Sequence, residues 1–198
     1  VNPSLWRQSK LNAEHGLFEV MPGIYQFRGY DISVMTIIRG KTGWIVIDPL
    51  LTAEAARAAF ALFERTIGKR PVSAIVFTHS HADHFGGVLG VIDAEDARRR
   101  GVPIVAPHGF PEEAVSENVL AGNAMSRRAS FMFGTILPAG PEGRVDNGLG
   151  AGLSSGTTGY LAPNRLIGPE GGLVEIDGGS FDFLDAAGTE APAEFLFY

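Results

Sequence analysis

The residues best suited to chemistry are the histidines and the aspartate of one short run, His79-Ser80-His81-Ala82-Asp83-His84. Imidazole nitrogens and carboxylate oxygens bind zinc and related ions, and one carboxylate among histidines is typical of a hydrolytic metal centre. Three of the chain's five histidines lie here. The alternative, a set of solvated loop histidines, explains this density poorly. The run therefore predicts a metal site.

The residues before this run indicate how its side chains are presented. Residues 72–78 are mostly apolar and predict a buried strand, and in an extended chain alternate side chains point to the same side. His79 and His81 are therefore expected to face one metal together. If a helix begins after them, Asp83 and His84 turn toward a second position nearby. The spacing predicts one metal site begun by the first pair and another begun by the second pair.

The remaining ligands must come from elsewhere in the chain. His15 lies in a polar amino-terminal segment and is expected to be solvated, and His108 follows a predicted strand as a loop residue. Asp48 ends an apolar strand at a turn, where a carboxylate is well placed to orient a ligand histidine. The chain has no cysteine, which excludes thiolate ligands and leaves the redox compartment open.

Composition and charge narrow the class of protein. The 198 residues suffice for one large domain, and 45% hydrophobic with 19% charged residues predicts a packed core rather than disorder. The net charge of -6 argues against a nucleic-acid partner, since the largest basic cluster is the triplet 98–100. No apolar run reaches membrane-spanning length, and no signal-peptide pattern opens the chain.

Apolar strand patterns alternate with helical patterns, which predicts an α/β fold with helices covering a sheet. The expected strands are 24–28, 32–38, 44–48, 72–77, 104–106, 173–176, 181–184 and 195–198. The expected helices are 53–67, with Thr52 as its cap, 87–98 and 111–128. Because the chain stops on a strand pattern, we expect it to be the amino-terminal portion of something longer.

Glycine is the compositional outlier, at 26 residues. Many of them fall between residues 134 and 179, among apolar residues that a solvated linker would not need. A long loop inside a compact domain is usually functional, so an ordered active-site loop is the preferred interpretation and a flexible linker is the alternative.

The histidine run, preceded by Thr78 and combined with Asp48 at an earlier strand end, resembles the metallo-β-lactamase superfamily. Further stretches resemble the alkylsulfatases within it, which hydrolyse dodecyl sulfate and related detergents. These stretches are 2–8, 77–87, 114–119, 121–128, 145–150 and 188–194. The resemblance spans essentially the whole chain, and the stretches 121–128 and 188–194 are the most specific.

The resemblance implies an αββα sandwich that is incomplete at the carboxy-terminal end. Residues 1–198 would then be the amino-terminal part of the catalytic domain, with no second domain in this chain. Where many superfamily members place a histidine, this chain has Glu190, which the resemblance makes the third ligand beside His79 and His81; Glu194 is the competing choice. A complete active site is expected to hold two zinc ions. The partners of Asp83 and His84 lie beyond this chain, so the second metal is expected to be weak or absent here.

The implied activity is hydrolysis of alkyl sulfate esters to an alcohol and sulfate by a metal-bound water, with Asp83 as the catalytic residue. The alternatives are a metal-binding fragment without activity and a metallohydrolase of another ester class. The full-length protein is expected to be a homodimer, and the family suggests a periplasmic or secreted location.

A sulfate group needs amide, hydroxyl and guanidinium donors, and the predicted substrate-binding residues follow from that need. They are Asn123, Arg127, Arg144, Gly148 and Tyr160. Arg127 has the alternative role of ending a helix, where a cation complements the dipole. The apolar residues 131–133 are expected to line a channel for the alkyl tail or to belong to the core.

Overall fold

The computed structural model describes residues 1–150 and 152–198, so Ala151 of the glycine-rich stretch lies outside the described residues. Its helical segments are α1 (Pro3–Asn12), α2 (Ala53–Thr66), α3 (Ala82–Phe85), the 3-10 turn η1 (Val88–Gly90), α4 (Ala94–Arg100), α5 (Phe110–Val115), the π-helical turn η2 (Ser116–Leu120) and α6 (Gly122–Met132). Its strands are β1 (Gly16–Met21), β2 (Ile24–Arg28), β3 (Met35–Arg39), β4 (Trp44–Ile47), β5 (Val72–Val76), β6 (Ile104–Pro107), β7 (Arg165–Ile167), β8 (Gly172–Ile176), β9 (Gly179–Asp185) and β10 (Phe195–Phe197).

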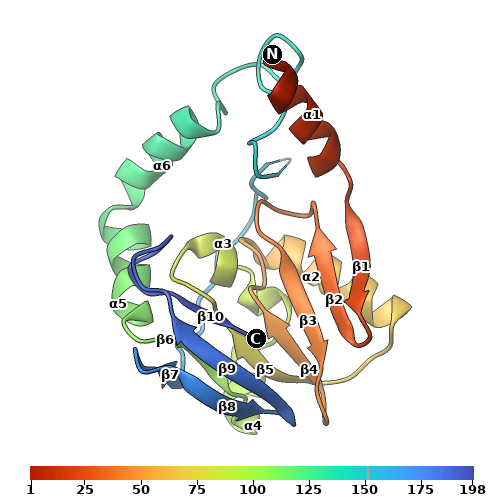
Figure 1. Cartoon of the computed structure of the whole chain (residues 1–198), viewed down its shortest axis with the longest axis vertical. Helices are drawn as coiled ribbons and strands as arrows, with labels where there is room; N and C mark the ends of the chain where they lie inside the picture. The colour runs from red at the N-terminus through yellow and green to blue at the C-terminus, as the bar shows by residue number, and fades with distance from the viewer. Residues whose placement is uncertain (151) are drawn as a thin grey trace.

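The strands form two sheets that lie against each other (Figure 1). The larger sheet has seven strands in the order β1-β2-β3-β4-β5-β6-β7. Its first four strands are antiparallel, and β4 through β7 are parallel. The smaller sheet is antiparallel, in the order β10-β9-β8. The carboxyl ends of the parallel strands β4, β5 and β6 therefore meet at one edge, where the loops after them gather.

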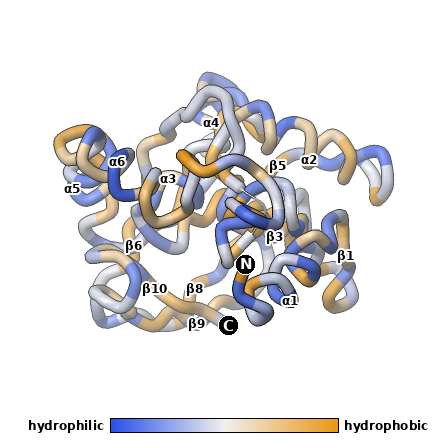
Figure 2. Tube along the Cα trace, turned by 90° about the horizontal axis from the view of Figure 1, so that it is seen from above, coloured by the Kyte–Doolittle hydropathy of each residue, from blue (hydrophilic) through white to orange (hydrophobic). Residues whose placement is uncertain are grey.

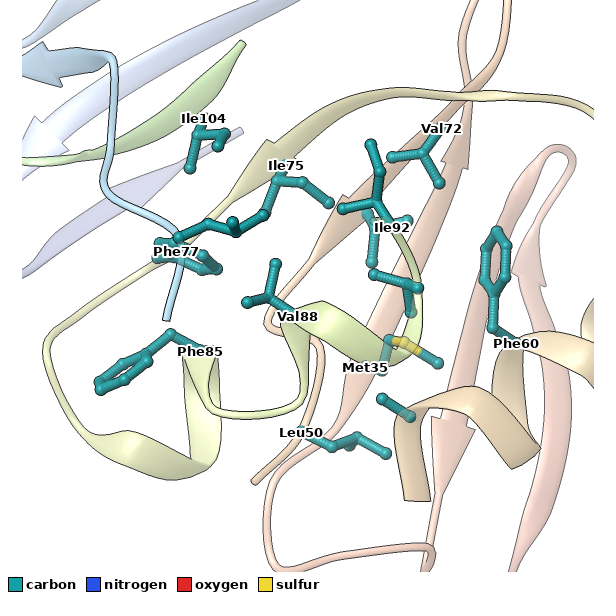
Figure 3. Close-up of a cluster of buried hydrophobic side chains, with 14 of the residues drawn as sticks. Met35, Leu50, Phe60, Val72, Ile75, Phe77, Phe85, Val88, Ile92 and Ile104 are labelled. Atoms are coloured by element: carbon teal, nitrogen blue, oxygen red, sulfur yellow. The ribbon is translucent and has the colours of Figure 1, made fainter. Parts of the chain in front are cut away.

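The helices and the two sheets form three layers, with an apolar core between each pair of neighbouring layers. The first core lies between the larger sheet and the helices, and Figure 3 shows side chains of β5 packed against residues from the α2 and η1 regions. The second core lies between the sheets and joins β4 and β5 to phenylalanines of β9 and β10. Figure 2 shows the resulting order, with α2 and α4 on one side, the larger sheet in the middle and β8–β10 on the other side. The described chain thus forms the αββ part of the expected sandwich.

The structure confirms most expected elements and changes the ends of several. The strand expected over 32–38 begins only at Met35, because the buried carboxylate of Asp31 holds the preceding residues in a turn. The helix expected over 87–98 is two pieces, since Asp93 caps a new helix with hydrogen bonds to the amides of Glu95 and Asp96. The helix expected over 111–128 is α5, η2 and α6, broken by the π-helical turn. The elements α1, β1 and β7 were not predicted.

The glycine-rich stretch is tied to the body of the protein at several points. Ser154 donates from its amide and its hydroxyl to the carboxylate of Asp31. The amide of Thr157 donates to Glu54 of α2 at 2.7 Å. Farther out, Asn12 of α1 donates to Asp146 at 2.8 Å. These contacts support the interpretation as an ordered loop for residues 146–150 and 152–157.

Helix α6 stands on the opposite side of the molecule from β1 and α2 (Figures 1 and 2). It follows α5 and η2, and its own residues are half-buried or exposed. None of the helices in the described part of the chain is both long enough and apolar enough to cross a membrane.

Asp177, in the turn between β8 and β9, links the two sheets. Its carboxylate accepts hydrogen bonds from the amide and hydroxyl of Thr42 at 3.0 and 2.7 Å and from the amide of Gly43 at 3.0 Å. Burial raises the pKa of Asp177, but the surrounding donors, Thr42 and Gly43 among them, outweigh it and hold the pKa below its usual value. The charged form is therefore the form that stabilises the fold.

Replacing Asp177 by asparagine should reduce the free energy of unfolding at pH 7 by about 1 kcal/mol. Charge-assisted hydrogen bonds are lost, while asparagine keeps the left-handed backbone that Asp177 adopts at φ 45°. A depressed carboxyl pKa contributes stability above the ordinary value of about 3.9 and loses it as the pH falls through the folded value. The difference between the two proteins should therefore shrink near pH 3, as measured by urea unfolding. The exposed Asp185→Asn serves as the control, and an equal Asp177 effect at both pH values would contradict the prediction.

Candidate metal centre

The histidine loop follows directly from β5 and is held between the two sheets. Three residues beyond the end of the strand, His79 forms an isolated antiparallel bridge with Glu194. The amide of Phe195 donates to the carbonyl of Thr78 at 3.1 Å. Helix α3 begins after His81, so Asp83 and His84 turn away from the extended segment as expected. The loop therefore presents its side chains from a rigid strand end.

His79, His81 and Glu190 bring three metal-ligating atoms together. His79 Nε2 lies 3.1 Å from His81 Nδ1. Glu190 Oε1 lies 3.8 Å from His79 Nε2 and 3.7 Å from His81 Nδ1. Two ligand atoms of a tetrahedral zinc lie about 3.3 Å apart, given Zn–N bonds of about 2.0–2.1 Å. The three separations bracket that value, so the donor set fits such an ion.

The hydrogen bonds around Thr78 assign the tautomer of His79. The hydroxyl of Thr78 donates to Asp48 Oδ2 at 2.6 Å, so it can only accept from His79 Nδ1, which lies 3.0 Å away. His79 therefore carries its proton on Nδ1 and turns the lone pair of Nε2 toward His81 and Glu190. Burial, followed by the charge of His84, lowers the pKa of His79 and favours this neutral ligand form.

Asp83 and His84 form a second group of potential metal ligands beside the first. The ring centroids of His79 and His84 are 3.9 Å apart. His84 Nε2 lies 3.3 Å from Asp83 Oδ2, and His84 Nδ1 lies 2.8 Å from Asp48 Oδ2. Burial lowers the pKa of His84, but the carboxylates of Asp48 and Asp83 outweigh it and raise the pKa to about 10. Asp48 thus orients a histidine of the run, the role that its place in the sequence indicates.

Glu190 and Glu194 have different surroundings, which separates the two carboxylates that compete for the ligand role. The side chain of Glu190 is 64% exposed and reaches both histidines. Glu194 is buried, and its Oε2 accepts from Thr189 Oγ1 and from the amides of Glu190 and Ala191. Burial raises the pKa of Glu194, but these donors outweigh it and hold the pKa below its usual value. Glu194 therefore organises the turn that presents Glu190.

A cavity of about 640 Å³ opens onto the metal-ligating residues His81, Asp83, His84 and Glu190. Its walls combine the metal-ligating residues with polar and apolar side chains: Ile32, Ser33, His81, Asp83, His84, Met132, Phe133, Asn147, Leu149, Leu153 and Glu190. A second cavity, of about 320 Å³, shares several of these residues and continues along α6 past Met125, Arg128 and Ala129. The metal-ligating groups thus face a space of mixed polar and apolar lining, beside a second space that is more apolar.

The predicted substrate-binding residues are spread around this space rather than gathered in it. Asn123 and Arg127 are exposed on α6. Gly148 lies between Asn147 and Leu149, which line the larger cavity. The ring of Tyr160 meets Phe85 edge-on at 5.8 Å. Arg144 has a buried Nε that donates to no residue in the described ranges. Their roles in substrate binding remain predictions.

Two residues of the site were not singled out from the sequence. Glu117 Oε2 lies 3.4 Å from His81 Nε2. Asn147 lines the larger cavity, and both polar atoms of its side chain are buried without a hydrogen-bond partner among the described residues. Glu117 lies in the stretch 114–119, whose resemblance to the alkylsulfatases was the sequence feature that could have pointed to it. His15 and His108 are exposed and outside this group, as expected.

Comparison with known proteins places this geometry in a family. The family model described as the metallo-beta-lactamase superfamily matches residues 28–184. The chain belongs to the metallo-β-lactamase superfamily. Among solved structures, a beta-lactamase domain protein from Burkholderia ambifaria aligns with a TM-score of 0.56 at 21% identity, over 92% of this chain and 50% of that one. That likeness supports the fold alone.

The alkylsulfatase resemblance is confirmed at much higher identity. A linear primary-alkylsulfatase from Pseudomonas sp. is 51% identical over 197 residues, which cover 100% of this chain and 29% of that protein. An alkyl/aryl-sulfatase from Saccharomyces cerevisiae is 48% identical over 198 residues, which cover 100% of this chain and 31% of that protein. The structure of a stereoselective inverting sec-alkylsulfatase from Pseudomonas sp. aligns with a TM-score of 0.95 at 47% identity, over 100% of this chain and 31% of that one.

These comparisons also show how much of the family's architecture is present. The metallo-β-lactamase fold that the sequence predicts is confirmed. The chain spans about 30% of the length of these alkylsulfatases, with 29% for the Pseudomonas relative and 31% for the yeast one.

Substitutions of Glu190 and Glu194, the two glutamates of the 188–194 turn, should have different effects on the free energy of unfolding of the metal-free protein. Glu194→Ala leaves two amides without their acceptor and should reduce the free energy of unfolding by about 1–3 kcal/mol. Glu190→Ala removes an exposed side chain and should change it by less than about 0.5 kcal/mol, while lowering metal affinity. Thermal unfolding with a chelator present measures the first effect, and metal titration measures the second. A large loss of metal-free stability in Glu190→Ala would contradict the assignment.

Proposed function

We propose that the full-length protein hydrolyses alkyl sulfate esters, such as dodecyl sulfate, at a zinc centre built on the histidine loop. The observation that carries this proposal is the convergence of His79 Nε2, His81 Nδ1 and Glu190 Oε1 within 4.8 Å of one another. The alkylsulfatases that match the whole chain at 51% and 48% identity favour a sulfate ester over other substrates of the superfamily.

The donor set suits zinc, because two imidazoles and a carboxylate are ligands that this ion prefers. His79, His81 and Glu190 would hold one ion, and Asp83 and His84 would contribute to another. When bound, zinc supplies Lewis-acid chemistry that makes a water nucleophilic near neutral pH. Asp48 fixes the orientation of His84, and Thr78 presents the lone pair of His79. Asp83, 25% exposed in its side chain and lining the larger cavity, is the proposed catalytic residue.

The two cavities suit a substrate with one anionic and one apolar end. A sulfate monoester needs hydrogen-bond donors, and Asn147 offers a buried amide that has no partner among the described residues. An alkyl tail needs an apolar surface, and Met132, Phe133 and Leu153 line both cavities. Asn123, Arg127, Arg144, Gly148 and Tyr160 remain proposed contributors to sulfate binding, from the loops and the helix around this space.

Two other functions stay open to test. The first is a metal-binding fragment that does not catalyse the reaction by itself, an alternative suggested by the 29% of the Pseudomonas alkylsulfatase that this chain covers. A metallohydrolase of another ester class would use the same metal-ligating residues. The homodimer and the periplasmic or secreted location are part of the proposal for the full-length protein.

Incubation of the full-length protein with dodecyl sulfate should release inorganic sulfate, and a chelator should abolish the release, because the proposed nucleophile depends on the metal. Zinc added back should restore it. Parallel assays with a phosphate monoester and a carboxylic ester test the other ester classes. Sulfate release that survives complete metal removal would refute the proposed centre, and faster cleavage of another ester would refute the substrate.

Residues 1–198 alone should bind zinc at a stoichiometry near one per chain, because His79, His81 and Glu190 are the group of three candidate ligands that the described residues bring together. The occupancy should fall as the pH is lowered, since a ligand imidazole must be neutral to bind the metal. Elemental analysis after dialysis measures the stoichiometry, and His79→Ala is the control for loss of binding. Two tightly bound zinc ions per chain would contradict the claim about the second site.

Asn123→Ala and Asn147→Ala in the full-length protein test the two amides separately. Each loses a donor for the sulfate group, so each should raise KM or lower kcat on dodecyl sulfate, by about tenfold for one hydrogen bond to a charged group. The zinc content should stay unchanged in both. Unaltered kinetics would remove the residue concerned from the substrate site.

A further inference from the structure

Glu117 is a carboxylate beside the metal-ligating residues that the proposed function leaves without a role. It lies in η2, where the amide of Ala121 donates five residues back to Ser116 at 2.9 Å. Single π-helical turns of this kind are frequent at functional sites, because the inserted residue changes the direction of the side chains around it. Figure 1 shows the two helices that this turn connects, α5 and α6.

The π-helical turn is anchored to the histidine loop by the residue next to Glu117. Asn118 donates from Nδ2 to the carbonyl of Ser80 at 3.3 Å and to the carbonyl of Ala114 at 2.9 Å. Ser80 lies between His79 and His81, so this contact sets the distance between the turn and the metal-ligating residues. Glu117 is therefore held toward His81.

The Glu117 carboxylate has one candidate hydrogen-bond donor near its buried oxygen, a proton on His81. Glu117 Oε2 is buried and has no hydrogen-bond partner of good geometry among the described residues, and a buried charged acceptor in that state is costly. The nitrogen facing it is His81 Nε2, at 3.4 Å. A proton on that nitrogen supplies the missing donor after a small adjustment of either side chain.

The other nitrogen of the same ring faces the metal-ligating atoms. His81 Nδ1 lies 3.1 Å from His79 Nε2 and 3.7 Å from Glu190 Oε1. A neutral imidazole carries its proton on one nitrogen and a lone pair on the other. A carboxylate on the Nε2 side therefore leaves the lone pair on Nδ1, where a metal needs it. Glu117 does not belong to the group of ligand atoms within 4.8 Å, so it acts through His81.

We propose that Glu117 is a positioning residue that holds His81 in the Nε2–H tautomer and so directs Nδ1 to the metal. This inference rests on the proposed metal centre. Outer carboxylates that accept from a ligand histidine typically contribute 10- to 100-fold in metal affinity. The same contact would keep the ring from rotating, which matters because His81 is 27% exposed and otherwise borders the cavities.

Three variants of the full-length protein separate this role from packing. Glu117→Met keeps most of the volume and removes the acceptor, so zinc affinity should fall about 10- to 100-fold. Glu117→Gln keeps a carbonyl oxygen that accepts a hydrogen bond from His81 Nε2–H, so its zinc affinity should fall by less than about threefold. Glu112→Met, an exposed change on α5, is the matched control and should leave the affinity unchanged. Competition with a chromogenic chelator measures all three affinities.

Cobalt(II) in place of zinc provides a second readout that a packing role would not move. A ligand imidazole bound through Nδ1 shows a strongly shifted, exchangeable N–H proton signal from Nε2, and a carboxylate acceptor slows its exchange with water. The signal lost on replacing His81 identifies that proton, and Glu117→Met should broaden it by faster exchange. Equal zinc affinities and unchanged exchange in Glu117→Met and wild type would overturn the inference, as would equal losses in the Gln and Met variants. Absence of zinc binding by the wild-type protein would instead overturn the proposed metal centre.

Discussion

The close approach of two imidazoles at the end of β5 is the interaction on which the rest of the site depends. His79 Nε2 and His81 Nδ1 are 3.1 Å apart, and the hydrogen bond to Thr78 assigns a lone pair to the first of them. With Glu117 in the proposed role, the second nitrogen also carries a lone pair. Two lone pairs and a carboxylate at this distance repel one another unless a cation lies between them. The fold holds them there because the loop follows β5 and is anchored by the bridge between His79 and Glu194 and by the hydrogen bond from Phe195 to Thr78.

Asp48 carries much of that rigidity. It accepts from the amide of Thr78 at 2.9 Å and from the Thr78 hydroxyl at 2.6 Å, and it contacts His84 at 2.8 Å. Its backbone has φ 50°, and Leu50 has φ 65°, both in the left-handed region that residues other than glycine rarely adopt. Such strain persists where surrounding contacts over-determine the conformation. Here it turns a buried strand end so that one carboxylate reaches both the loop and the first turn of α3.

The two sides of the larger cavity are built differently. The histidines and Asp83 come from the strand-end loop and α3, and Glu190 comes from the turn between β9 and β10. The strand-end loop and α3 rest on a core that includes the fully buried Phe77, its ring stacked on Phe110 at 5.3 Å. The opposite walls come from α6 and the glycine-rich loop, whose residues Met132 and Leu149 are largely exposed. A rigid frame with exposed loops opposite it is an arrangement in which one fold can host different chemistries.

The sequence by itself determined the local part of this site. The alternation of an extended strand predicts that His79 and His81 share a side, and a helix start predicts that Asp83 turns away; both depend on backbone geometry over a few residues. Glu190, by contrast, was predicted from the family resemblance and not from local backbone geometry. The strands, the helices and the covering of a sheet by helices also follow from the period of the apolar residues, because burial selects that period directly. The two-sheet sandwich followed from the family resemblance.

Only the tertiary structure decided which distant groups meet these residues. The π-helical turn has no clear local signature, and it directs Glu117 to His81 while the residues after it, including Asn123, follow a different helical phase from the one a continuous helix would impose. Which of Glu190 and Glu194 faces the histidines is decided by the folded turn. There Glu194 accepts hydrogen bonds from the amides of Glu190 and Ala191, and Glu190 is left facing His79 and His81. The contact between Glu117 and His81 depends on packing between segments far apart in the chain, and side-chain spacing along the sequence carries no record of it.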